Sequence, residues 1–136
     1  MNYFDFSSQL GQSYPGVELL ARWLRMLPQV KDVQIIQDNP DYFHVGDISF
    51  KTETLVTKYI EVKTETRTSH ETPNLAIERY SDTSRKTDGG PWATSADYYV
   101  HIYADKVMSF MQTSEVRRWL EPQLKGFRWF EAKNIS

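Results

Sequence analysis

The sequence predicts an α/β (α+β) fold in which a β-sheet is flanked by helices. Two observations carry this prediction. A largely apolar helical segment comes first, and several runs of β-branched and aromatic residues follow it before a second helical segment. The chain has 136 residues, of which 40% are hydrophobic and 25% charged. These values are typical of one globular domain spanning residues 1–136.

The first half of the chain predicts one helix and three strands. Residues 16–27 carry charged side chains at i, i+4 and i+7 among apolar ones, a pattern typical of a largely buried helix, and Pro28 ends it. The period then changes to two in residues 32–37, which indicates a strand. Residues 42–50 and 55–63 are rich in β-branched and aromatic residues and predict a hairpin.

The second half predicts two further strands, a helix and a last short strand. Thr113 or Ser114 can cap the helix at its N-terminus, and Pro122 ends it. We expect loops at residues 64–72 and 81–91. The predicted elements are residues 74–80, 96–103, 113–120 and 127–130.

Composition and charge exclude several function classes. The chain has no cysteine, so disulfide scaffolds, cysteine-containing zinc sites and thiol nucleophiles are excluded. A net charge of -2 argues against coating nucleic acid through bulk positive charge, but a metal-dependent nuclease is compatible with it. No segment looks like a signal peptide or a membrane span, so we expect a cytoplasmic protein that does not act at membranes.

The predicted hairpin carries the residues that point to chemistry. Glu61 and Lys63 are two apart in a strand and project to one face, whereas Val62 projects into the core. The hairpin can place Asp47 beside them. Two neighbouring carboxylates are costly unless a cation lies between them, and Mg²⁺ prefers such oxygen ligands. The alternative is an edge strand with solvated charges.

The chain resembles the PD-(D/E)xK nuclease superfamily, in particular its small phage-type members. The motif reads Gly46-Asp47 followed by Glu61-Val62-Lys63, with glycine in place of the name-giving proline. Three downstream segments add to the resemblance. They are Asn74-Leu75-Ala76-Ile77-Glu78, Gly90-Pro91-Trp92-Ala93-Thr94-Ser95-Ala96-Asp97-Tyr98 and Thr113-Ser114-Glu115-Val116.

The resemblance implies a restriction-endonuclease-like core, with a central mixed β-sheet flanked by helices in an αβββαβ arrangement. It implies that Asp47 and Glu61 are metal ligands, that Lys63 is the catalytic lysine and that Glu18 is a helix-borne catalytic acid. The implied activity is Mg²⁺-dependent endonucleolytic hydrolysis of DNA, with Mn²⁺ able to substitute. The alternative is a catalytically inactive module of the same fold that binds nucleic acid or a protein partner.

Other residues are candidates for the site or for DNA contacts. Glu78 is either a further ligand or a surface charge. Trp92 can stack on an unpaired base, cover the edge of the site or fill the core. For Asp97 we favour a structural role, in which it accepts backbone hydrogen bonds.

Loop cations are candidates for positioning phosphates, with solvated charge as the alternative. These residues are Arg67, Arg79, Arg85 and Lys86. We expect the histidines to be non-catalytic. A homodimer that cuts both strands is a further expectation, with residues 98–103 or the last helix as its interface.

Overall fold

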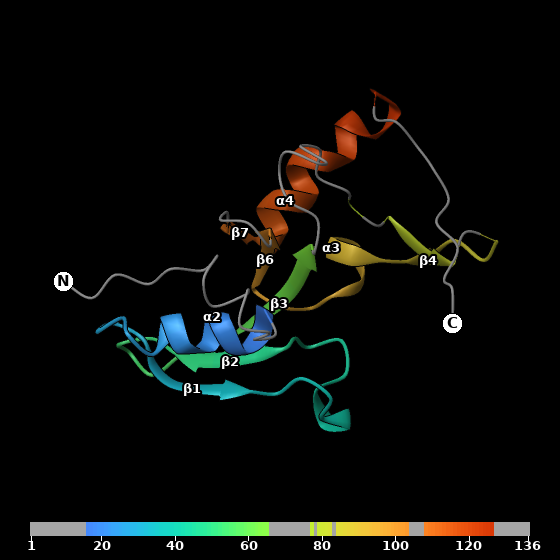
Figure 1. The fold of residues 1–136 in the computed structure, drawn as a ribbon. Helices are drawn as coiled ribbons and strands as arrows, with labels where there is room; N and C mark the ends of the chain where they lie inside the picture. The colour runs from blue at the N-terminus through green and yellow to red at the C-terminus, as the bar shows by residue number, and fades with distance from the viewer. Residues whose placement is uncertain (1–15, 66–76, 78, 83, 104–107, 127–136) are drawn as a thin grey trace.

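The structure is a computed structural model that describes residues 16–65, 77, 79–82, 84–103 and 108–126. It shows an α+β arrangement of a mixed sheet and helices, which confirms the predicted class at this level (Figure 1). In chain order the elements are α2 (Gly16–Leu24), β1 (Lys31–Ile35), η1 (Pro40–Tyr42), β2 (Ile48–Lys51), β3 (Thr57–Glu65), β4 (Tyr80–Asp82), β5 (Thr87–Asp88), α3 (Gly90–Ala93), β6 (Tyr98–Tyr103), β7 (Met108–Gln112), α4 (Thr113–Leu120) and η2 (Glu121–Gly126).

Five of the described strands form one sheet in the order β1-β2-β3-β6-β7. The pair β3 and β6 is parallel, and the other three pairs are antiparallel. Parallel neighbours need a long crossover connection, and here the chain between β3 and β6 includes the β4–β5 hairpin and α3. The crossover therefore places β4, β5 and α3 beside one end of the sheet (Figure 1).

The helix α2 covers one face of this sheet. Its residues Leu20 and Leu24 are buried against Ile60 of β3 and Val100 of β6, and Val62 packs against the same cluster. Because side chains alternate along a strand, the residues between these apolar positions point to the opposite face. Glu61 and Lys63 therefore project from the face that α2 does not cover.

The predicted strand at residues 42–50 was wrong in its first half. Pro40 opens the short helix η1, and the side chain of Asn39 caps it by accepting a hydrogen bond from Asp41 N at 3.0 Å. His44 then has φ 66° and Gly46 φ 150°, values incompatible with an extended strand. The strand β2 begins only at Ile48.

Three other differences concern the second half of the chain. The predicted loop at residues 81–91 contains most of the β4–β5 hairpin, whose strands are too short to give a periodic pattern. The strand β7 was not predicted, although it pairs with β6 along its whole length. Neither Thr113 nor Ser114 caps α4, because Gln112 occupies the N-cap position. Residues 74–76 and the predicted last strand at 127–130 lie outside the described residues.

No helix within the described ranges is both long and apolar enough to cross a membrane.

Candidate metal centre

The register of the β2–β3 hairpin brings Asp47 and Glu61 together. The β2–β3 ladder ends at the pair Ile48 and Ile60; Asp47 directly precedes Ile48, and Glu61 directly follows Ile60. Asp47 thus lies just beyond the end of the ladder, where the strand that carries Glu61 continues. Two hydrogen bonds fix the position, because Asp47 N donates to Ile60 O at 2.7 Å and Asp47 Oδ2 accepts from Val62 N at 2.8 Å.

Gly46 allows this close approach between the loop and β3. It has φ 150°, and a Cβ atom at this position would lie 2.8 Å from the backbone oxygen of Ile60. Proline has φ fixed near -65°, so it does not fit the conformation found here. Glycine at this position is therefore required by the local backbone of this chain.

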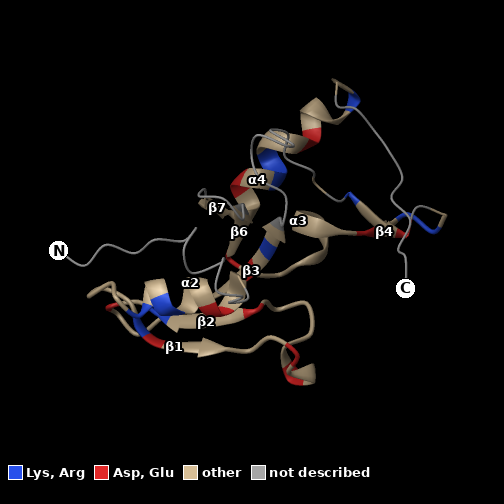
Figure 2. Ribbon diagram, viewed as in Figure 1, with Lys and Arg blue, Asp and Glu red and all other residues tan. Residues whose placement is uncertain are grey.

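Asp47 and Glu61 line a cleft of about 540 Å³, a volume within the range of small-ligand sites. One wall is formed by residues 36–47, the other by residues of β4, β5 and α3, with Glu61 between them. Two more acids, Asp38 and Asp88, line the same cleft. Within the described part of the chain no lysine or arginine lines it. The described lining of the cleft is therefore acidic, and Figure 2 shows where the acidic residues lie along the ribbon.

This environment disfavours the ionised form of both central carboxylates. Burial, and secondarily repulsion by Asp47, raises the pKa of Glu61 from 4.5 to about 7, against the lowering effect of a hydrogen bond from Thr94. Burial also raises the pKa of Asp47, with repulsion from Asp38 adding to the rise and the bond from Val62 N opposing it. A bound cation would reverse this balance and favour both anions.

Thr94 connects Glu61 to the surrounding structure. Its hydroxyl lies 3.3 Å from Glu61 Oε2 and accepts a hydrogen bond from Ala96 N at 3.1 Å. The guanidinium of Arg117 on α4 donates to the backbone oxygens of Pro91 and Thr94. Arg117 therefore anchors the segment that presents Thr94 to the carboxylate.

The pair of carboxylates fits a Mg²⁺ ion better than a metal that needs a full set of protein ligands. No group of three or more His, Cys, Asp or Glu side chains that could hold a metal occurs among the described residues. Magnesium is usually held by one or two carboxylates and completes its shell with water and substrate phosphate. Asp47 and Glu61 are the two carboxylates here that could hold such an ion.

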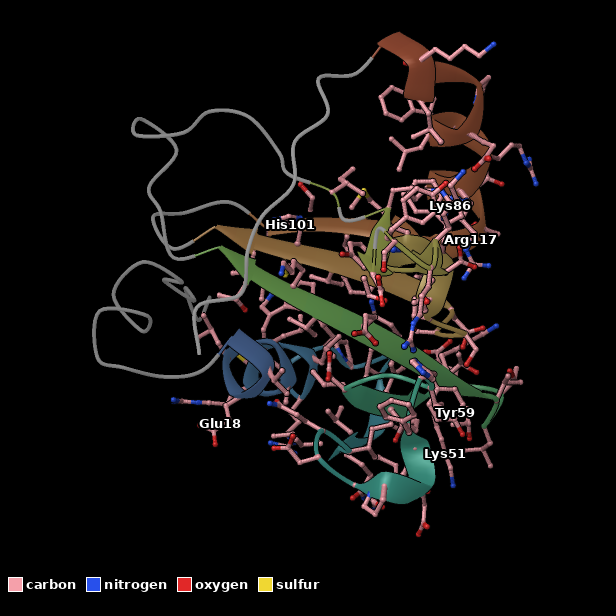
Figure 3. All side chains as sticks on the ribbon, turned by 90° about the vertical axis from the view of Figure 1, so that its right-hand side faces the viewer. Glu18, Lys51, Tyr59, Lys86, His101 and Arg117 are labelled. Atoms are coloured by element: carbon pink, nitrogen blue, oxygen red, sulfur yellow. The ribbon has the colours of Figure 1, made fainter. Side chains whose placement is uncertain are left out.

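The structure places Lys63 near the pair but leaves Glu18 apart from it. Lys63 is exposed and lies two residues beyond Glu61 on the same face of β3, outside the lining of the cleft. Glu18 is exposed on α2, which covers the opposite face, and it points away from β3 (Figure 3). The geometry thus gives no support to Glu18 as a member of this site.

Of the predicted phosphate-positioning cations, the three that the structure describes do not line the cleft. Arg79 forms a 2.7 Å ion pair with Asp88, and its guanidinium lies over the ring of Trp92 at 4.6 Å. Arg85 and Lys86 are exposed in the turn of the β4–β5 hairpin (Figure 2). Arg67 and Glu78 lie outside the described residues.

Two residues of the crossover segment have structural partners. Trp92 Nε1 donates to Glu121 at 2.8 Å, so this indole links α3 to η2. Asp97 accepts a hydrogen bond from Tyr59 N at 2.9 Å, and its backbone oxygen accepts one from Thr113 N. The structural role favoured for Asp97 is therefore the one observed.

Sequence reasoning missed four residues of this region. They are Asp38, Asp88, Thr94 and Arg117. Thr94 lies inside residues 90–98, one of the segments on which the resemblance rests. That segment was the sequence feature that could have pointed to Thr94. Nothing in the local sequence of the other three indicates that they lie in this region, because a loop, the crossover and the packing of α4 bring them there.

Comparisons of the chain with family models, curated proteins and solved structures found no match. The resemblance to PD-(D/E)xK nucleases therefore stays a prediction based on the motif residues.

Proposed function

We propose that this protein is a Mg²⁺-dependent endonuclease that hydrolyses phosphodiester bonds in DNA, built on a restriction-endonuclease-like core. The observation that carries the proposal is the placement of Asp47 and Glu61 at the end of the β2–β3 ladder, in one acidic cleft, with the Asp47 carboxylate bonded to Val62 N next to Glu61. Without a cation the pair is electrostatically unfavourable, as the raised pKa of Glu61 indicates. Such an arrangement is typical of functional sites.

Each residue of the site would have a separate role in this reaction. Asp47 and Glu61 would hold Mg²⁺, which when bound supplies positive charge to a phosphate and its leaving oxygen. The hydrogen bond from Val62 N fixes the Asp47 carboxylate, and Thr94 fixes that of Glu61. Lys63 would add its ammonium charge on the same face of β3, where it can approach a phosphate held at the pair.

The test is cleavage of end-labelled duplex, single-stranded and four-way-junction DNA in Mg²⁺, Mn²⁺ or EDTA. We expect cutting that requires the metal and that falls at least about a hundredfold in Glu61→Gln and in Lys63→Ala. Two residues of the same hairpin give matched controls. Glu53 is exposed in the β2–β3 turn, and Lys58 lies on the face of β3 opposite to that of Glu61. Glu53→Gln and Lys58→Ala should cut like the native protein.

One observation favours the inactive-module alternative, namely that Lys63 does not line the cleft. If no DNA form is cut in either metal while DNA binding is equal in the native protein and Glu61→Gln, the nuclease proposal is wrong. The same result would support a binding module.

A further inference from the structure

An exposed aromatic side chain stands at the rim of the acidic cleft. Phe43 lines the cleft and is 76% exposed. The ring of His44, also exposed and also lining the cleft, lies 3.9 Å from the Phe43 ring between centroids, at an angle of 51°. Single exposed apolar residues are common on proteins. Phe43 differs from the comparably exposed Leu55, because Leu55 lies in the β2–β3 turn and not at the cleft.

The backbone that carries this aromatic pair is held in place from both sides. The carbonyl oxygen of His44 accepts hydrogen bonds from Ser95 N and from Ser95 Oγ, each at 2.9 Å. His44 has φ 66°, an uncommon conformation that these bonds stabilise. On the inner side, the ring of Tyr42 packs 6.5 Å from that of Tyr59. Phe43 is therefore presented outward on a fixed loop.

The other aromatic candidate for base stacking is already engaged. Trp92 is covered by the Arg79 guanidinium at 4.6 Å and is tied through Nε1 to Glu121. Its position thus suits a link between α3 and its neighbours. A stacking surface at the cleft is supplied instead by Phe43.

We propose that Phe43, braced by His44, stacks on an unpaired nucleobase next to the phosphate held at Asp47 and Glu61. This inference rests on the proposed function and names its substrate class, which is single-stranded DNA or unpaired ends and flaps. In a duplex the base faces are covered by their neighbours, so an exposed ring can stack only where a base is unpaired. The phosphate would then bind to the cation in the acidic cleft, and the base would stack on Phe43 at its rim.

The experiment measures binding of a DNA 12-mer carrying 2-aminopurine, as a single strand and as a duplex, with Ca²⁺ in place of Mg²⁺. Stacking on Phe43 should quench the fluorescence of the single strand. We expect Phe43→Ala to weaken single-strand binding by roughly tenfold or more, since one base–aromatic contact is worth about that much. Phe43→Trp should retain the binding, and Leu55→Ala should match the native protein.

Two results would overturn the inference. One is equal single-strand binding by the native protein and Phe43→Ala, and the other is no preference of the native protein for the single strand over the duplex.

A thermal melt of each variant verifies that it is folded, and retention of binding by Phe43→Trp excludes a mere loss of packing. If DNA is cut in Mg²⁺ but Phe43→Ala has no effect on single strands, the inference fails and the nuclease stands. If binding depends on Phe43 but no DNA is cut, only the nuclease fails.

Discussion

The carboxylate of Asp47 accepts the backbone N–H of Val62 at 2.8 Å, and Val62 is the residue that follows Glu61 in β3. The backbone of β3 therefore fixes the side chain of an acid that directly precedes β2. This bond keeps Asp47 beside Glu61 although both carry a raised pKa. The two acids are held together by the fold and not by mutual attraction.

The raised pKa of Glu61 makes the metal-free protein less stable as the pH rises. The carboxyl titrates near 4.5 in the unfolded chain and near 7 in the folded protein, so the folded state binds the proton more tightly. The associated stability is fully present below about pH 4.5 and is lost as the pH rises through about 7. In EDTA at about pH 8, Glu61→Gln should unfold at higher urea concentration, with a gain of about 2 kcal/mol after allowance for partial exposure.

The same comparison at about pH 4 should show no difference between Glu61→Gln and the native protein, because Glu61 is then protonated in both states. Glu53→Gln, in the exposed β2–β3 turn, should change nothing at either pH. A Glu61→Gln variant that is no more stable at about pH 8 would contradict the burial and repulsion assigned to this carboxyl.

Thr94 should set the pH dependence of the site through Glu61. Its hydroxyl lies 3.3 Å from Glu61 Oε2 and lowers the pKa of that carboxyl. Thr94→Val removes the bond, so the Glu61 pKa should rise and the acid limb of the pH profile for cleavage should move to higher pH. Thr94→Ser keeps the hydroxyl and should leave the limb unmoved. If the acid limbs of Thr94→Val and Thr94→Ser lie at the same pH, Thr94 does not set the pH dependence of the site.

Replacing Arg117 should lower the free energy of unfolding more than replacing its neighbour Arg118. Arg117 donates to the backbone oxygens of Pro91 and Thr94, whereas Arg118 is exposed and forms a surface ion pair with Glu115 at 3.2 Å. Arg117→Ala leaves two partly buried acceptors without a charged donor and should cost about 1–3 kcal/mol in urea unfolding. Arg118→Ala should cost under about 0.5 kcal/mol. Equal losses would argue against the anchoring role of Arg117.

Gly46 should not tolerate a side chain. Its φ of 150° is rarely adopted by other residues, and a Cβ atom would approach Ile60 O to 2.8 Å. Gly46→Ala should therefore destabilise the protein by about 1–3 kcal/mol. At Gly126 a Cβ atom would meet none of the described residues within 4 Å, so Gly126→Ala should be close to neutral. Urea midpoints of the two variants measure the difference.

The sequence predicted those parts of the fold whose periodicity reflects burial. The helix α2 and the strands β3 and β6 were expected near their observed positions, because their apolar residues repeat at the period of the element. The start of β2 was misplaced, since cap and turn chemistry at Asn39, Pro40 and His44 outweighs the strand propensity of the run. The strand β7 gave no clear alternation, and its pairing with β6 determines it.

The candidate site was predictable where strand geometry alone decides it. Asp47 and Glu61 come together because they adjoin the last pair of the β2–β3 hairpin, and the period of two already placed Lys63 on the face of Glu61. Asp38 reaches the region on a loop, Asp88 on the crossover and Arg117 on α4, and how these segments lie depends on tertiary packing. Glu18 was assigned by resemblance alone, and the face that α2 covers keeps it away.

The most direct test of the account is divalent-cation binding by Asp47 and Glu61. Free Mn²⁺ gives a six-line electron paramagnetic resonance spectrum that is lost on binding, so titration counts the bound ions. We predict that the native protein and Glu53→Gln bind Mn²⁺, that Mg²⁺ displaces it, and that Asp47→Asn and Glu61→Gln bind at least about tenfold more weakly. Equal binding by all four proteins, or no binding by the native one, would contradict the proposed metal centre.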